Sequence, residues 1–310
     1  MRLLLVRHGE TVDNVAGIYA GITDSPLTNH GMVQSRKLGQ FLRSNDTHIE
    51  RIFSSDLQRS FLTAEAIRKS QKTTAAPVIR LEILREKNFG KYEGTKISRG
   101  GVESTSISSR PVSNTGMIEM SHGTESSRSM KTRAESFIDL HLAPSLRDAS
   151  ENSTIIVVSH GIFLGHLWRE LLRNFDTEVI SKTLTHTNSM ESLEKIKGWY
   201  NTAYLELCIT RRCKEKIFSS NSTPVNDQTL HSATCIQSAQ SPQKSTYTLG
   251  KNNTNHHASS NKLLSQMQMT VMSINRRDHL EGVRKSRRGT GSLKYEPTQR
   301  TMFSYFAKKD

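Results

Sequence analysis

The 310-residue chain is long enough for one large domain or two ordinary ones, but its hydrophobic content of 34% is low for a chain that folds throughout. Its formal charge of +14 is uneven, because residues 211–310 hold 17 Lys and Arg against 6 Asp and Glu, whereas residues 1–210 hold 26 against 23. Three scattered cysteines argue against a disulfide scaffold, and the N-terminal apolar run is too short for a signal peptide. No stretch is as long as a membrane span. We therefore expect a cytoplasmic protein.

The first 210 residues alternate between short apolar runs and segments with helical spacing. The apolar or β-branched runs predict strands at Arg2–Val6, Ile49–Ser54, Val78–Leu84, Thr154–Val158 and Ala203–Ile209. Apolar residues three and four apart predict helices at 31–44, Asp56–Arg68, Thr132–Leu146 and Gly161–Arg173. Strands that alternate with helices predict a three-layer α/β/α sandwich around a mostly parallel sheet, which we assign to a domain at 1–210.

Two regions break this pattern. Residues 94–131 are crowded with Ser, Thr, Arg and Gly, which predicts a mobile surface insertion. Residues 211–298 are rich in Ser, Asn, Gln, Thr and basic residues, and their apolar content is too low to offset the entropy of an ordered chain. We therefore expect a disordered tail there, with at most a weak helix at Leu263–Met272.

Four of the predicted strands each end in a polar residue suited to catalysis. The first runs into Arg7-His8-Gly9-Glu10-Thr11, and the second leads to Arg59 at the start of a helix. The third ends in Leu84-Arg85-Glu86 and the fourth in Ser159-His160-Gly161. Groups just beyond the carboxyl ends of strands in an α/β sheet meet in one crevice, so we expect these four side chains to lie together.

The chemistry of this set is that of phosphoryl transfer. A neutral imidazole such as His8 is a good nucleophile toward phosphorus, and positive neighbours disfavour its protonation. Arg7, Arg59 and His160 can surround a phosphoryl group and stabilise its oxygens in the transition state. Glu86 is placed to protonate the leaving group, although Glu82 and Glu93 are nearby rivals. The set calls for no metal ion and no other cofactor.

These motifs resemble those of the histidine phosphatase superfamily, which has the phosphoglycerate mutase-like fold. Arg7-His8-Gly9-Glu10-Thr11 resembles its signature, and Asp24-Ser25-Pro26-Leu27-Thr28 with Gly31 and Gln34 resembles its next loop and helix. The resemblance spans residues 1–210 and implies a phosphohistidine at His8 and an acid at Glu86. It also implies a phosphate site formed by Arg7, Asn14, Ala20, Gly21, Arg59, His160 and Gly161.

The resemblance leaves phosphatase and mutase activity both open. The sequence Phe89-Gly90-Lys91-Tyr92-Glu93-Gly94 resembles the phosphatase branch, including fructose-2,6-bisphosphatase-like members, and no arginine pair of the mutase type follows Glu86. We expect a metal-independent phosphomonoesterase that acts on a small sugar or glycolytic phosphate. Arg99 and Arg110 could still supply a mutase-type clamp, so phosphoglycerate mutase-type transfer is the alternative.

The C-terminal segment supports a second hypothesis, that of a binding partner. Within residues 299–309, Gln299, Met302, Tyr305 and Phe306 fit the spacing of a PIP box, the peptide that binds the sliding clamp of replication. One turn of 3₁₀ helix would bring Met302, Tyr305 and Phe306 onto one side as a hydrophobic plug. Basic clusters upstream, such as 284–288, favour nuclear import or a solvated tail over direct nucleic-acid binding.

Overall fold

The computed structural model describes most of the first two-thirds of the chain and two segments near its C-terminus. The described ranges are 1–72, 76–97, 123–175, 196, 198–211, 264–285 and 289–298. Within these ranges, none of the helices combines the length and the apolar character needed to cross a membrane.

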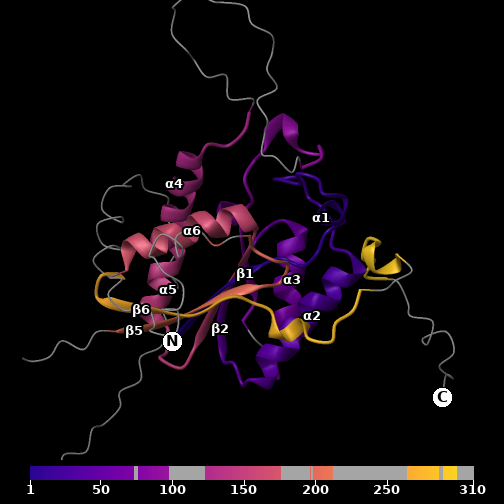
Figure 1. The fold of residues 1–310 in the computed structure, drawn as a ribbon. Helices are drawn as coiled ribbons and strands as arrows, with labels where there is room; N and C mark the ends of the chain where they lie inside the picture. The colour runs from indigo at the N-terminus through magenta and orange to yellow at the C-terminus, as the bar shows by residue number, and fades with distance from the viewer. Residues whose placement is uncertain are drawn as a thin grey trace, which may run out of the picture.

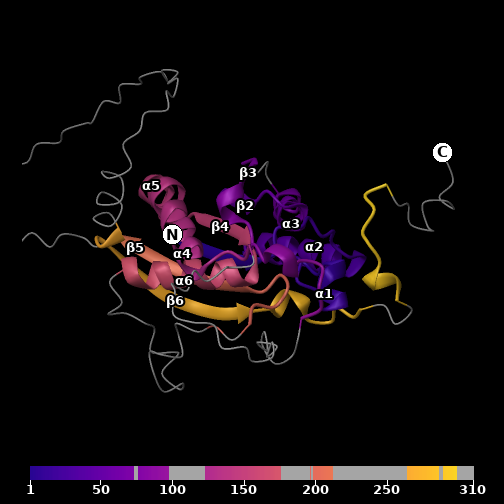
Figure 2. The ribbon, with the colours of Figure 1, turned by 90° about the horizontal axis from the view of Figure 1, so that it is seen from above.

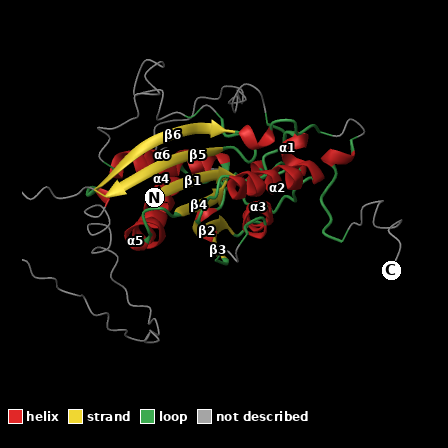
Figure 3. Ribbon diagram, turned by 90° about the horizontal axis from the view of Figure 1, so that it is seen from below, coloured by secondary structure: helices red, strands yellow, loops and turns green. Residues whose placement is uncertain are grey.

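Six strands form one sheet in the order β3-β2-β4-β1-β5-β6, which can be followed across Figure 3. Their bounds are β1 Arg2–Arg7, β2 Ile49–Ser55, β3 Val78–Leu81, β4 Thr154–Ser159, β5 Tyr204–Arg211 and β6 Met267–Arg276. The first four strands pair in parallel, whereas β5 runs antiparallel to β1 and β6 antiparallel to β5. The prediction of a mostly parallel sheet in an α/β fold is therefore confirmed.

Helices cover both faces of this sheet (Figures 1 and 2). Their bounds are α1 Val12–Ala16, α2 Asn29–Ser44, α3 Gln58–Lys69, α4 Ser127–Phe137, α5 Ala143–Asp148 and α6 Gly161–Asn174. One π-helical turn, Ile138–Leu142, joins α4 to α5. Single 3₁₀ turns lie at Glu82–Leu84, Gly90–Tyr92, Asp278–Leu280 and Thr290–Ser292.

Alternation along β1 shows how the sheet divides the core in two. Leu3 and Leu5 belong to the cluster packed against α4, α5 and α6, whereas Leu4 and Val6 belong to the cluster packed against α2 and α3. Successive side chains of a strand point to opposite faces, so an uninterrupted apolar run fits a strand covered on both sides. The carboxyl ends of β1 and β4 then open between the two helical layers.

The C-terminal segment corrects one expectation. Residues 264–285 and 289–298 are ordered, and Met267–Arg276 forms a strand along β5 where a weak helix was predicted. The physical reason is a period of two, because Met267, Met269 and Val271 are buried while the residues between them are not. Methionine favours helices on its own, but pairing with β5 and burial of this row decide the outcome.

After β6 the chain crosses the outer surface of α2. The amide of Asn29 donates to the carbonyl of Leu293 at 2.9 Å, and the amide of Tyr295 donates to the carbonyl of Leu27 at 2.8 Å. Lys285 forms an ion pair with Glu10, two residues beyond His8. The segment therefore packs against the loop that follows β1, and the expected disorder of 211–298 is wrong for these residues.

The expected insertion at 94–131 is also ordered at both of its ends. The amide of Ile97 donates to the carbonyl of Gly17 at 2.7 Å, and α4 begins at Ser127 with Ser126 as its N-cap. Residues 98–122, the centre of that prediction, lie outside the described residues, as do residues 212–263 of the tail.

Candidate active site

A cavity of about 440 Å³ opens at the carboxyl ends of β1 and β4. Of the predicted site residues, it is lined by Arg7, His8, Asn14, Ala20, Gly21, Arg59, Glu86 and Gly161. The structure thus brings together residues from strand ends and loops that are more than 150 positions apart in the chain. His160 is the one predicted member that does not reach the wall.

His8 is held in a single tautomer. Its Nδ1 lies 2.7 Å from the carbonyl oxygen of Gly9, and because a carbonyl can only accept, Nδ1 carries the proton. The lone pair is therefore on Nε2, which has no hydrogen-bond partner among the described residues. Burial first, and then the positive charges of Arg7 and Arg59, hold the pKa of His8 well below its ordinary value. His8 is thus a neutral imidazole with a free nitrogen.

Two guanidinium groups flank this imidazole. Arg59 is buried and donates to the carbonyls of Gly21 at 2.6 Å and Thr23 at 2.8 Å, so it is fastened to the loop beneath the cavity. Arg7 donates to the carbonyl of Trp199, while its buried Nε has no hydrogen-bond partner among the residues that the structure describes. Burial lowers the pKa of both arginines. An oxyanion in the cavity would offset positive charge that burial makes costly.

His160 lies behind Arg59. It is fully buried, its ring centroid is 5.1 Å from that of His8, and its Nδ1 accepts a hydrogen bond from Arg59 Nε at 3.2 Å. Because Nδ1 accepts, the proton is on Nε2, which donates to Ser60 Oγ at 3.3 Å. Burial first, and then Arg59, keep the pKa of His160 well below its ordinary value. In this arrangement His160 contacts Arg59 and the ring of His8, which both line the cavity, and does not line it itself.

Glu86 reaches the opposite wall and is the only carboxylate among the described residues that line the cavity. Its two oxygens accept hydrogen bonds from the amides of Lys87 (2.9 Å), Phe163 (3.1 Å) and Ile162 (3.2 Å). The last two amides belong to the first turn of α6, where unpaired N–H groups and the helix dipole attract negative charge.

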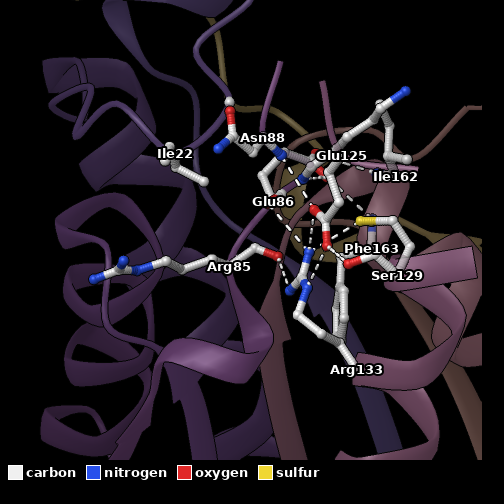
Figure 4. A network of polar contacts seen from close by, with 12 residues as sticks. Ile22, Arg85, Glu86, Asn88, Glu125, Ser129, Arg133, Ile162 and Phe163 are labelled. Atoms are coloured by element: carbon white, nitrogen blue, oxygen red, sulfur yellow. Dashed lines mark hydrogen bonds and ion pairs between the residues drawn. The ribbon is translucent and has the colours of Figure 1, made fainter. Parts of the chain in front are cut away.

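The loop that carries Glu86 is anchored by a pair of charged residues, shown in Figure 4. Arg133 of α4 donates to the carbonyls of Ile83 and Arg85, each at 2.9 Å. The same guanidinium forms an ion pair with Glu125 at 2.8 Å, and Glu125 accepts from the amide of Asn88. Backbone on both sides of Glu86 is therefore tied to the start of α4.

The two rival carboxylates have other partners. Glu93 accepts from the amides of Ile22, Thr23 and Phe89, and it does not line the cavity. The Glu82 side chain is 77% exposed and pairs with Arg85. Of the three carboxylates weighed from the sequence, Glu86 is the one that lines the cavity.

The chain resembles known proteins in sequence and in fold. The sequence profile of the histidine phosphatase superfamily (branch 1) matches residues 3–198 of the chain. The chain belongs to the histidine phosphatase superfamily. The matched range contains every residue predicted for the catalytic and phosphate sites.

Among the relatives of this histidine phosphatase, one is named as a phosphatase and another as a phosphoglycerate mutase. A probable phosphatase of Schizosaccharomyces pombe is 32% identical over 234 residues, covering 72% of this chain and 78% of the relative. A probable phosphoglycerate mutase of Erwinia tasmaniensis is 34% identical over 172 residues, covering 56% and 75%. The solved structure of a mycobacterial hydrolase has the same fold at 20% identity, with a TM-score of 0.50 and coverage of 68% of this chain and 90% of that one. This histidine phosphatase is thus an enzyme of phosphatase or phosphoglycerate mutase-like type that acts on small phosphorylated molecules.

The sequence did not indicate the other residues that line the cavity of this histidine phosphatase. The missed lining residues are Ile18, Tyr19, Phe89, Ile97, Ile162, Gly165, Arg169, Ile196, Gly198 and Trp199. Most are apolar and come from loops, so no local pattern separates them from core residues. Arg169 is an exception, because its spacing of four from Gly165 and eight from Gly161 places all three on one face of a helix.

Proposed function

We propose that this enzyme hydrolyses phosphomonoesters through a phosphohistidine at His8, and that it needs no metal ion. The observation that carries the proposal is the unprotonated Nε2 of His8 on a cavity that also presents Arg7, Arg59 and Glu86. Nucleophile, charge stabilisation and proton donor are then supplied by side chains already in place.

The reaction has two steps. Nε2 of His8 attacks phosphorus, the P–O bond to the leaving group breaks, and Glu86 gives its proton to the leaving oxygen. Water then attacks the phosphohistidine, the P–N bond breaks, and Glu86 takes a proton from the water, which restores the enzyme and releases inorganic phosphate. Arg7 and Arg59 lie where they can hold the phosphoryl oxygens in both steps, and His160 positions Arg59.

The test measures release of phosphate from p-nitrophenyl phosphate, with a chelator present throughout. We expect the wild-type chain to turn over, His8→Ala to lose turnover, and the exposed His48→Ala to match the wild type. Equal rates for the wild type and His8→Ala would refute the phosphohistidine route. Loss of wild-type activity on chelation would refute independence from metal.

For the substrate we propose a small sugar or glycolytic phosphate, with fructose 2,6-bisphosphate as one candidate. We also propose hydrolysis over mutase-type transfer, which the sequence after Glu86 supports because it lacks an arginine pair. Incubation with 3-phosphoglycerate separates the two activities. Hydrolysis yields phosphate and glycerate, whereas 2-phosphoglycerate as the main product would establish the alternative.

A second proposal concerns the C-terminal peptide. We propose that residues 299–309 bind a sliding clamp through Gln299, Met302, Tyr305 and Phe306, and that the protein reaches the nucleus as well as the cytoplasm. These residues lie outside the described residues, so the support is their spacing in the sequence. The full chain should bind purified clamp at micromolar concentrations, and the double change Tyr305→Ala and Phe306→Ala should abolish binding. No binding of the wild type at about 100 micromolar would refute the proposal.

A further inference from the structure

The cavity contains a third guanidinium that the reaction above does not use. Arg169 lies in α6, is half-buried and lines the same cavity as His8. Among the described residues it has no hydrogen-bond or ion-pair partner. By contrast, Arg173 in the next turn of α6 pairs with Glu170. A half-buried arginine that faces a cavity without a counter-charge is a ready site for an anion.

Two glycines determine where this guanidinium lies. A Cβ built on Gly165 would be 3.7 Å from Nη2 of Arg169, so the arginine extends back along α6 toward its N-terminus. A Cβ built on Gly161 would be 3.8 Å from Nε of Arg7. Gly161 and Gly165 are four residues apart, which corresponds to roughly 6 Å along a helix axis. The guanidiniums of Arg7 and Arg169 therefore lie beside two positions of α6 that are about one helical turn apart.

The charge and polarity of the rest of the cavity also favour the binding of a second anion beside Arg169. Its lining holds three guanidiniums, those of Arg7, Arg59 and Arg169, and among the described residues only one carboxylate, Glu86. Apolar side chains such as Ile162 and Trp199 form much of the wall, and a less polar wall strengthens charge interactions. A volume of about 440 Å³ is also in the range of sites for whole small molecules, so space remains beyond a bound phosphoryl group.

We infer that Arg169 binds a second anionic group of the substrate, a carboxylate or a second phosphate, while the first phosphate faces His8. The inference rests on the proposed function and narrows its substrate class. The preferred substrates are small phosphomonoesters that carry a further negative charge able to reach Arg169 while the phosphorus faces His8. A neutral phosphorylated alcohol would leave Arg169 without a partner.

Paired substrates that differ only in the second anion test this inference. Glycerol 3-phosphate carries a hydroxymethyl group where 3-phosphoglycerate carries a carboxylate, and fructose 6-phosphate lacks one phosphate of fructose 1,6-bisphosphate. We expect the wild type to have a higher kcat/KM for the member with the second anion in at least one pair. A preference in the first pair indicates that Arg169 binds a carboxylate, and a preference in the second pair indicates that it binds a phosphate. Arg169→Met should reduce that preference, measured as a ratio of kcat/KM, about 10- to 100-fold and mainly through KM.

Two variants serve as controls. Arg169→Lys keeps the charge and should restore part of the preference, which a merely structural role would not predict. Arg128→Met removes an exposed arginine from α4 and should leave the preference unchanged. If Arg169→Met slows both members of each pair equally, or if the wild type shows no preference in either pair, the inference is wrong.

Binding separates failure of this inference from failure of the proposed function. In the His8→Ala variant, calorimetry with 3-phosphoglycerate and fructose 1,6-bisphosphate measures affinity without turnover. Adding Arg169→Met should weaken binding of at least one of these ligands about tenfold or more relative to its single-anion partner. A result of this kind supports the Arg169 site even if no substrate is hydrolysed, and unchanged affinities overturn it even if hydrolysis proceeds.

Discussion

Replacement of Gly31 by alanine tests whether the close packing of α2 against the loop after β1 sets the position of His8. A Cβ built on Gly31 would lie 2.1 Å from the carbonyl oxygen of Glu10, whereas a relaxed contact of carbon with carbonyl oxygen needs roughly 3.3 Å. The loop must therefore move by roughly 1 Å. Gly9 lies in the same contact, since its own Cβ would be 2.6 Å from the carbonyl oxygen of Gly31. The displaced backbone begins next to the nucleophile.

A displacement of this size should lower the catalytic rate strongly and the free energy of unfolding only moderately. Misplacement of reacting groups by about 1 Å can cost on the order of 100-fold in rate. Forcing extra volume into a packed region costs about 1–3 kcal/mol, partly offset by the better helix propensity of alanine. We expect Gly31→Ala to fold, with a lower thermal midpoint, and to lose roughly two orders of magnitude in kcat on p-nitrophenyl phosphate.

Gly39 of the same helix is the matched control. A Cβ there would be 2.5 Å from Ser70 Oγ and 2.9 Å from the carbonyl oxygen of Ala66, so Gly39→Ala also forces a clash, but against α3 rather than the catalytic loop. It should lower the thermal midpoint and leave kcat nearly unchanged. The reasoning is refuted if folded Gly31→Ala keeps wild-type kcat, or if Gly39→Ala loses as much kcat as Gly31→Ala.

Three further predictions follow from the site and the C-terminal segment. Glu86→Gln should slow alkyl phosphates by about two to four orders of magnitude and aryl phosphates less, because aryl leaving groups need little protonation; equal losses would remove Glu86 as the acid. Because burial, Arg7 and Arg59 hold the pKa of His8 well below 6.5, kcat/KM should stay level as pH falls through 6.5 and decline only in more acidic buffer, and a midpoint at 6.5 would contradict this. Burial lowers the pKa of His279 to about 4 in the folded chain, so His279 stays neutral there when the pH falls below 6.5. In the unfolded chain the same side chain is already protonated at that pH, which favours unfolding. The free energy of unfolding should thus drop by about 3 kcal/mol between pH 7 and pH 4 through this residue, and urea titrations of His279→Gln should lack that part of the drop.

The residues of the catalytic core could be predicted from the sequence because each one follows a short segment whose pattern indicates a strand. Apolar runs of four to six residues fix buried strands, and the polar residue after each run must appear at the carboxyl edge of a parallel sheet. The sequence therefore predicts that His8, Arg59 and Glu86 lie together, and in the structure all three line one cavity with Gly161. The role of each residue stays a prediction until the variants are measured.

Other features follow from contacts between distant segments, which no local pattern encodes. The strand Met267–Arg276 forms because it pairs with β5 at the edge of the sheet and because the buried side chains of both strands join one hydrophobic cluster. This outweighs the preference of its methionines for helices. The recess of His160 behind Arg59 is likewise set by a contact between residues 101 positions apart, and the cavity beside Arg169 is lined by loops far from α6 in the sequence. The sequence by itself determined which residues meet at the sheet edge, because strand ends are local. Only the tertiary structure decided which carboxylate faces the cavity and where a second anion fits, because burial and charge depend on the whole fold.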